Sequence, residues 1–230
     1  TIGKIMIAIH SLRIENTPVT LRELALVKVR QAIISGYFKA GDRLVERSLC
    51  DELGVSRTVV REVIRYLEAE GLIENLPKKG PIVARLTWEV AQQIYSIRQL
   101  LESAAAEDCA RTATAEDKQA LHTRLMRIAS ASEHHDDIER VEASQAFYET
   151  LFSIAEHHIA WEIVQRLNSR ISRLRALTLR SPERQVAGFE RMSRIYAAVE
   201  ASNPQQAREA VIQHLTEAAQ LAKTILTTEE

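Results

Sequence analysis

The residues of this chain best suited to recognising a ligand form a cluster of hydroxyl and arginine side chains: Ser56, Arg57, Thr58 and, one helical turn later, Arg61. A guanidinium donates two parallel hydrogen bonds to a guanine edge or to a phosphate, and hydroxyl groups bond to phosphates or bases. Helix N-termini also attract phosphate through their backbone amides. The cluster therefore indicates contact with a nucleic acid. For any single arginine a solvated helix surface is the alternative, and the presence of several on one small module weighs against it.

The segment around this cluster has a helix-turn-helix pattern. A helix is expected over residues 46–53 and ends at Gly54, Ser56 caps a second helix over residues 57–70, and Gly71 ends that helix. The second helix has an inward apolar face that comprises Val59, Val60, Val63, Ile64 and Leu67. In a helix-turn-helix the second helix lies in the major groove of DNA, with its N-terminal residues at the base edges. The cluster falls at that N-terminus.

Further basic residues flank the motif. Arg47 begins the preceding helix, from which it can reach a DNA backbone. Short strands are expected at residues 72–75 and 82–84, with a tight turn between them. Lys79 and Gly80 lie in this turn, which forms a flexible basic wing suited to a minor groove or a phosphate.

The rest of the chain is predicted to be helical. We expect an N-terminal arm over residues 1–20, a winged helix-turn-helix domain over residues 21–86 that opens with a helix at 21–35, and a helical domain over residues 87–230. The helices expected in the last domain span residues 87–112, 114–134, 138–156, 159–180, 182–201 and 204–227. Short connections make neighbouring helices antiparallel. The predicted fold is therefore mainly α, an N-terminal winged helix-turn-helix followed by a C-terminal antiparallel bundle of about six helices.

Composition and charge narrow the class of protein. Residues 1–86 hold 14 Lys and Arg against 10 Asp and Glu, whereas the remaining residues hold 16 against 21. The N-terminal part of the chain therefore suits a polyanionic partner.

Cys50 and Cys109 form no CxxC pattern and are expected to be free thiols. The sequence shows no nucleophile–base pair, P-loop or metal cluster of the kind that would indicate an enzyme. No apolar run approaches the roughly 18 residues of a spanning helix, so we expect a cytoplasmic protein without a membrane partner.

The segment from Gly36 to Val83 resembles the winged helix of the GntR family of bacterial transcription regulators. The resemblance is carried by the run LGVSRT at residues 53–58, by Arg61-Glu62, and by LEAEGL at residues 67–72. The family usually has proline where Val59 stands, which is a mild departure. When the family's DNA-contacting positions are transferred to this sequence, the resemblance implies that the following residues contact DNA: Arg47, Ser56, Arg57, Thr58, Arg61 and Gly80. Lys79 is implied as a neighbouring contact.

The helical half resembles the FCD effector domain of the FadR subfamily, on the run YSIRQLLE at residues 95–102 and the segment 203–215. The resemblance implies a homodimer that binds double-stranded operator DNA and responds to a small-molecule effector. We expect a repressor whose operator affinity is set by a small organic acid. The alternative is a DNA-binding regulator whose helical domain only dimerises and binds no small ligand.

Many FCD domains hold a metal ion through an Asp and a His four residues apart, a later His and a last His. The corresponding positions here are Ser144, Tyr148, Met192 and His214, of which only the last matches, so we expect no metal and no other cofactor. The same residues are candidates for a metal-free effector site, in which Tyr148 and His214 bond to the ligand and Arg98 pairs with its carboxylate. The alternatives are a core histidine at His214 and a bundle salt bridge at Arg98.

Overall fold

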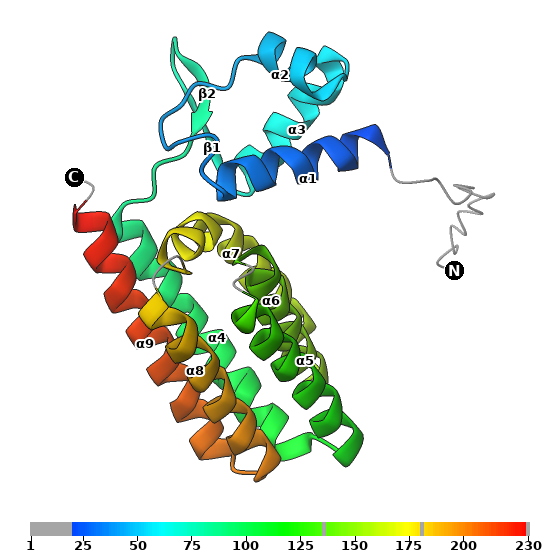
Figure 1. Cartoon of the computed structure of the whole chain (residues 1–230), viewed down its shortest axis with the longest axis vertical. Coiled ribbons are helices and arrows are strands. Elements are labelled where there is room, and N and C mark those ends of the chain that lie inside the picture. The colour runs from blue at the N-terminus through cyan, green and yellow to red at the C-terminus, as the bar shows by residue number, and fades with distance from the viewer. Residues whose placement is uncertain (1–19, 135–136, 180–181, 229–230) are drawn as a thin grey trace, which may run out of the picture.

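The computed structural model describes residues 20–134, 137–179 and 182–228, and within these ranges the side chains of residues 137–138, 168–169, 171–179, 182–187 and 228 are not described. The arm predicted for residues 1–20 thus lies outside the described residues, apart from Thr20. Within the described ranges the chain forms a small head, with three helices and a two-stranded sheet, above a bundle of six long helices (Figure 1). The predicted fold class is confirmed.

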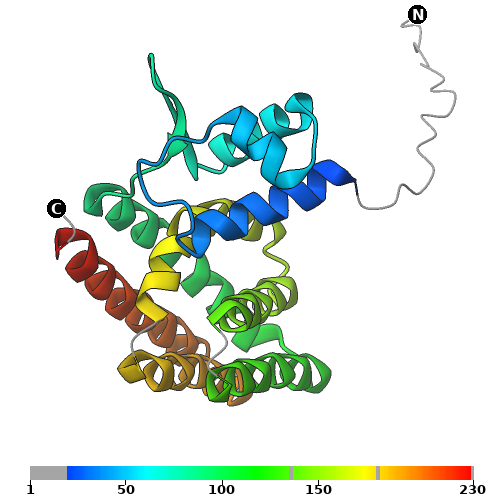
Figure 2. The same ribbon diagram turned by 45° about the horizontal axis from the view of Figure 1, so that its top comes forward.

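The head comprises five elements: α1 (Leu21–Ile34), α2 (Glu46–Leu53), α3 (Arg57–Ala69), β1 (Ile73–Leu76) and β2 (Gly80–Val83). The two strands are antiparallel, with Leu76 opposite Gly80. In Figure 2 the hairpin that they form projects away from the helices. The strand prediction was right in number, with boundaries that differ by one or two residues.

The core of the head is made by α1, α2, α3 and the hairpin together. The buried side chains are Ala25, Val29, Ile33, Leu44, Leu49, Val60, Val63, Ile64, Leu67, Leu72, Ile73 and Val83. Four of the five apolar residues predicted to face inward from α3 are buried, and Val59 packs at the edge. Helix α1 uses only part of its apolar periodicity, because Leu21, Leu24 and Val27 lie exposed.

The bundle comprises α4 (Trp88–Thr112), α5 (Ala115–Glu133), α6 (Asp137–Ile154), α7 (His158–Leu179), α8 (Pro182–Glu200) and α9 (Pro204–Thr228). Helices α4 and α9 are antiparallel neighbours, since Gln99 Nε2 donates to Thr216 Oγ1 at 2.9 Å and Arg208 pairs with Glu107 at 2.9 Å. The largest apolar side chains of the bundle that are almost completely buried are Phe147, Phe152, Leu121, Leu151, Ile195 and Leu215. Burying each stabilises the fold by about 1.5–3 kcal/mol.

Both cysteines are free thiols, as predicted. Burial raises the pKa of the Cys109 thiol to about 12, so this thiol stays protonated at neutral pH. No helix among the described residues has the length and apolar character needed to cross a bilayer.

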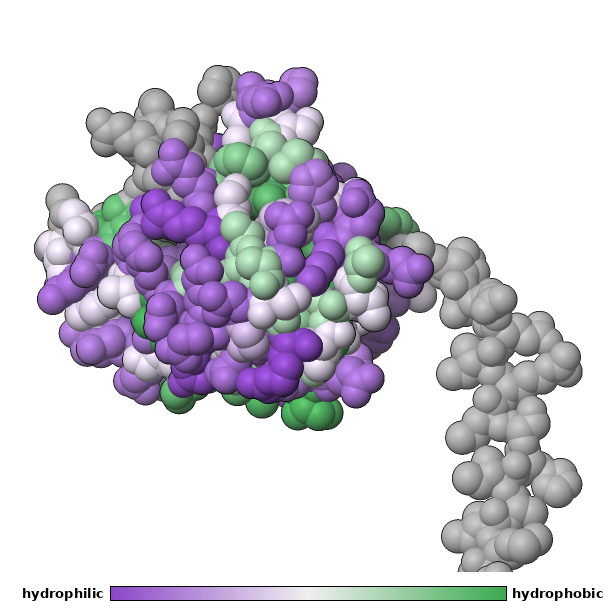
Figure 3. Space-filling model, turned by 90° about the horizontal axis from the view of Figure 1, so that it is seen from below, coloured by the Kyte–Doolittle hydropathy of each residue, from purple (hydrophilic) through white to green (hydrophobic). Residues whose placement is uncertain are grey.

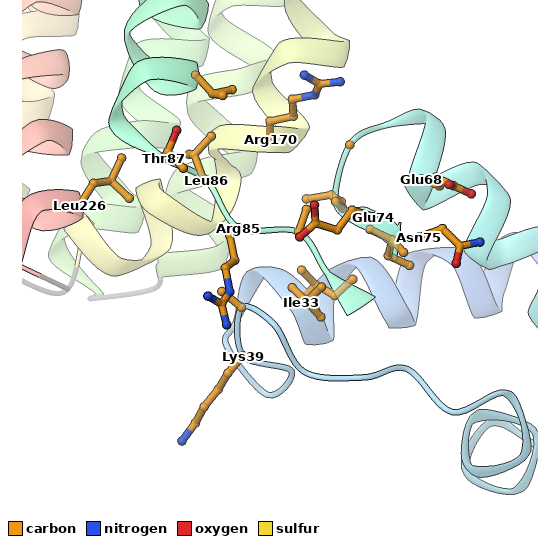
Figure 4. Close-up of a pocket in the computed structure, with 17 residues that line it drawn as sticks. Ile33, Lys39, Glu68, Glu74, Asn75, Arg85, Leu86, Thr87, Arg170 and Leu226 are labelled. Atoms are coloured by element: carbon orange, nitrogen blue, oxygen red, sulfur yellow. The ribbon is translucent and has the colours of Figure 1, made fainter. Parts of the chain in front are cut away.

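Two arginines lie at the junction of the head and the bundle. Figure 4 shows a groove between the two parts, with Arg85 beside it from the linker and Arg170 from α7. The guanidinium of Arg170 lies against Gly71, where a Cβ atom would overlap it, and that of Arg85 lies similarly against Gly41. Gly71 follows the C-terminal end of α3, the negative end of the helix dipole, where a cation is stabilising. The bundle thus touches the turn that directly follows the helix with the arginine cluster.

We expect Gly71→Ala to lower the free energy of unfolding by more than Gly54→Ala does. Both glycines have positive φ, +74° and +65°, and an L side chain there costs about 1–2 kcal/mol. Only at Gly71 does the new methyl group also displace an arginine. Chemical denaturation measures the difference, and equal losses would contradict a stabilising Arg170 contact. Gly188→Ala, inside α8 with open space around it, serves as the control and should be stabilising by about 0.5–1 kcal/mol.

Candidate nucleic-acid interface and bundle interior

The N-terminus of α3 presents the hydroxyl–arginine cluster. Gly54 adopts a left-handed conformation that ends α2, and the extended backbone of Ser56 then begins α3. Ser56 Oγ accepts a hydrogen bond from the backbone N–H of Val59 at 3.4 Å, so Ser56 is the predicted N-cap. Arg57 and Thr58 lie exposed in the first turn. Cationic and hydroxyl groups thus surround a helix end whose backbone amides favour anions.

Arg61 is held in place by a residue that the sequence analysis missed. Arg61 Nε donates to both carboxylate oxygens of Glu46, at 3.0 Å each, and this hydrogen bond, followed by the carboxylate charge, raises the pKa of Arg61. The contact uses Nε alone, so both Nη groups remain able to donate to a base or a phosphate. Glu46 therefore positions Arg61 across the turn from α2. The sequence signal was weak because fifteen residues separate the pair.

The remaining predicted contacts come from two other elements. Arg47 is exposed in the first turn of α2, next to Glu46, and thus close in the chain to the residue that holds Arg61. Lys79 is exposed at the tip of the hairpin, where its backbone N–H donates to the carbonyl of Leu76 at 3.1 Å. Gly80 has φ of +79°, which a side chain rarely permits. Arg47 thus lies on α2, next in the chain to the residue that holds Arg61, and the wing residues lie on a separate projecting hairpin.

Inside the bundle, Arg98 forms an ion pair with Glu102. Arg98 Nε and Nη2 donate to the two carboxylate oxygens at 2.5 and 3.2 Å, and the side chains are only 1% and 0% exposed. Burial opposes the charge of Arg98, but the attraction of Glu102 outweighs burial and raises its pKa. The guanidinium also lies 5.7 Å from the centre of the Tyr95 ring. The bundle salt bridge named above as an alternative is therefore present, and an effector carboxylate would compete with Glu102.

The other candidate effector residues line the bundle interior. Tyr148 and Met192 are buried, and Ser144 and His214 are partly buried. The rings of Tyr148 and His214 are stacked, with 6.4 Å between their centres. Met192 belongs to the same apolar core.

One further buried charge in this region was also missed by the sequence analysis. Arg140 is 3% exposed and lies four residues before Ser144 and eight before Tyr148, on the same face of α6. The spacing of four residues between Arg140, Ser144 and Tyr148 was visible in the sequence. An arginine is usually exposed, however, so the sequence gave no reason to place Arg140 in the core. Two arginines and one glutamate are thus the buried charged side chains of the described residues.

The predicted effector positions do not suit a metal ion. A serine hydroxyl, a phenol and a thioether are poor ligands for zinc, and a single imidazole cannot hold the ion alone. The described parts of the chain also contain no group of three or more His, Cys, Asp or Glu residues arranged to bind a metal. The donor set therefore does not fit the ion that many FCD domains hold.

Comparisons with known proteins cover most of the chain. Residues 21–83 match the family described as bacterial regulatory proteins of the gntR family, and residues 93–217 match the FCD domain. An HTH-type transcriptional regulator of Bacillus subtilis, YdhC, is 28% identical over 200 residues, which cover 86% of this chain and 89% of that protein. The HTH-type transcriptional repressor RspR of Escherichia coli K12 is 26% identical over 199 residues, 86% of each chain.

Solved structures show the same fold. McbR/YncC of E. coli has a TM-score of 0.76 at 20% identity, over 90% of this chain and 99% of that one. A putative GntR regulator from Rhodococcus sp. RHA1 has a TM-score of 0.74 at 23% identity, over 87% of this chain and 96% of that one.

We expect Glu102→Ala to lower the free energy of unfolding by about 3–5 kcal/mol, because it leaves the Arg98 guanidinium buried without its carboxylate. Arg127→Ala is the matched control. It removes an ion pair with Glu139 in which both side chains are more than a third exposed, and solvent screening leaves such a pair with little effect on stability. Urea denaturation of both variants measures the contrast, and a similar loss for the two would contradict a structural role for the buried pair.

Proposed function

Because the chain belongs to the GntR family and carries an FCD domain, we propose that this DNA-binding transcription regulator is a homodimeric repressor controlled by a small organic acid. The family resemblance predicted from the sequence is confirmed, and family membership points away from an enzyme. The observation that carries the DNA-binding part of the proposal is the exposed N-terminus of α3, where Arg61 is held by Glu46 beside Arg57. Repression is supported by the similarity to a protein named as a repressor.

The proposed DNA contacts divide by role. Arg57 and Arg61 read base edges in the major groove, because arginine can donate two hydrogen bonds to guanine. Ser56, Thr58 and Arg47 bond to phosphates near the helix end, and Lys79 and Gly80 of the wing approach the adjacent backbone or minor groove. Two heads on a near-palindromic operator multiply weak half-site affinities, which is the reason to propose a homodimer.

The proposed effector site is the interior around Tyr148, His214, Met192 and Ser144, close to Arg98. Two buried arginines, Arg98 and Arg140, lie among these helices, and a carboxylate is a suitable partner for a guanidinium. The ligand would be held without a metal or another cofactor, by the phenol, the imidazole and the guanidinium. An effector changes operator affinity only by binding one arrangement of the heads better than another.

One observation favours the alternative, in which the bundle only dimerises. Arg98 is already paired with Glu102 in a buried bidentate contact, so the interior has a satisfied ion pair without any ligand. An acid that binds there must rearrange this pair or approach Arg98 from another side.

We expect Arg57→Ala and Arg61→Ala each to weaken operator binding by about 1–3 kcal/mol and to relax base preference, because each removes a contact to a base edge. The operator is first selected from random DNA with the parent protein, and affinities are then measured at fixed salt. Arg124→Ala, which removes an exposed cation from α5, is the matched control. Unchanged operator affinity in both α3 variants would refute the assignment of α3 as the recognition helix.

For the effector, we expect at least one acid of a small organic acid panel to raise the melting temperature, and this rise to persist in the presence of a chelator. Tyr148→Phe removes only the buried hydroxyl and should reduce the shift while leaving the unliganded protein folded. Elemental analysis of protein prepared without a tag or added metal should find no stoichiometric ion, and finding one would refute the metal-free site. If no acid shifts the melting temperature of a protein that is dimeric and binds its operator, the result would support the alternative, in which the helical domain only dimerises.

A further inference from the structure

Helix α3 presents three sides along its length, and each has different surroundings. The core side consists of Val60, Val63, Ile64 and Leu67, which are buried. Residues three, four and seven apart share a side of a helix, so the remaining side chains of α3 form further rows beside the core. One of these rows faces α1, and another faces neither α1 nor the core.

The row toward α1 carries Glu62, Tyr66 and, at the C-cap, Glu70, and its charges are paired within the head. Glu70 accepts two hydrogen bonds from the guanidinium of Arg30 on α1, at 3.0 and 2.5 Å. Glu62 lies 3.9 Å from Arg22 of the same helix, whose guanidinium is 5.5 Å from the centre of the Tyr66 ring. Both arginines of α1 thus have a carboxylate partner on α3.

The third row carries Thr58, Arg61 and Arg65, which are three and four residues apart and all exposed. Arg61 is held by Glu46 of α2. Arg65, in contrast, forms no ion pair with any side chain that the structure describes. A cation that the sequence analysis did not select therefore lies one turn beyond Arg61, in the same row as two of the proposed DNA contacts.

Exposure and charge by themselves do not single out Arg65. The end of the bundle remote from the head is also largely hydrophilic, as Figure 3 shows, and a solvated helix face normally carries charged residues. The distinguishing features of Arg65 are its row and its lack of a partner. The arginines on the α1 side of α3 are neutralised by carboxylates, whereas the charge of Arg65 remains available on the side that carries Arg61.

The position of Arg65 along α3 determines which part of a DNA duplex it can reach. It lies four residues after Arg61 and eight after Arg57, or about 6 and 12 Å further along the helix axis. In a helix-turn-helix the N-terminal residues of the second helix approach the base edges. A side chain two turns into that helix lies nearer the wall of the groove, which is lined by phosphates. A guanidinium there can donate two hydrogen bonds to one phosphate.

We propose that Arg65 binds a phosphate of the operator backbone and extends the DNA interface along α3 beyond the residues that read bases. The inference rests on the DNA-binding part of the proposed function, in which α3 is the recognition helix. Phosphate contacts fix the register and orientation of a protein on the duplex without reading its sequence. Arg65 thus helps to set the angle at which α3 enters the groove, and with it the base edges that Arg57 and Arg61 meet.

Salt dependence tests this role. Losing one phosphate contact makes the log–log plot of affinity against salt shallower by about 0.9. Between about 50 and 200 mM salt, Arg65→Ala should therefore lose about 3.5-fold less affinity than the parent protein loses. At fixed salt its affinity should fall by a similar factor on the selected operator and on unrelated DNA, with the base preference unchanged. Fluorescence anisotropy over a salt series measures these quantities, and thermal melting checks that each variant is folded.

Two control variants accompany the test. Arg65→Lys keeps the positive charge and should retain the salt dependence of the parent. Arg124→Ala removes an exposed cation from α5 and should retain it as well.

The outcomes separate this inference from the proposed function. A parental salt slope for Arg65→Ala, alongside weakened binding by Arg57→Ala and Arg61→Ala, would overturn the phosphate contact and leave the proposed function intact. A changed base preference for Arg65→Ala would also overturn it, because the residue would then contact a base edge. If all three variants bind DNA as the parent does, α3 is not the recognition helix, and the DNA-binding part of the proposed function is itself contradicted.

Discussion

The buried ion pair of Arg98 and Glu102 lies on the interior side of α4, where each charge depends on the other. Two charges in a medium of low polarity are tolerable only while they remain paired and hydrogen-bonded, and Tyr95 packs over the guanidinium from the same helix. Removing either charge therefore leaves the other buried without its partner. The opposite side of the helix faces outward and carries Ile97 and Leu100.

The same orientation reaches the reading head through covalent and non-covalent contacts. Helix α4 starts five residues after β2 ends, so the wing and the first bundle helix cannot move independently over long distances. Arg170 and Arg85 then fill spaces that only glycine leaves open, at Gly71 and Gly41. Gly71 lies at the C-terminal end of α3, whose N-terminus carries the arginine cluster. A change in the orientation of α7 would therefore act on the recognition helix at the end remote from DNA.

Much of this architecture was readable from the sequence because its signals are local. Ser56 and Asn203 cap α3 and α9 where these helices were predicted to begin, since capping depends on a few consecutive residues. The sequence did not reveal which apolar residues of α1 are buried, because their burial depends on where α3 packs against that helix. The pairing of Arg61 with Glu46 was also hidden, since it depends on the angle between two helices. The roles of the individual contact residues remain predictions.

The interior of the bundle constrains what an effector must supply. A carboxylate that approaches Arg98 exchanges one anion for another, because Glu102 already occupies the guanidinium, so the charge of the ligand contributes little net free energy. Selectivity must then come from the body of the ligand, through apolar contact with Met192 and hydrogen bonds to Tyr148 and His214. If Glu102 is displaced, the buried ion pair of α4 is broken at the moment of binding, and the freed carboxylate must find another partner inside the bundle or reach solvent. Any such rearrangement changes operator affinity only if it favours one arrangement of the heads over another.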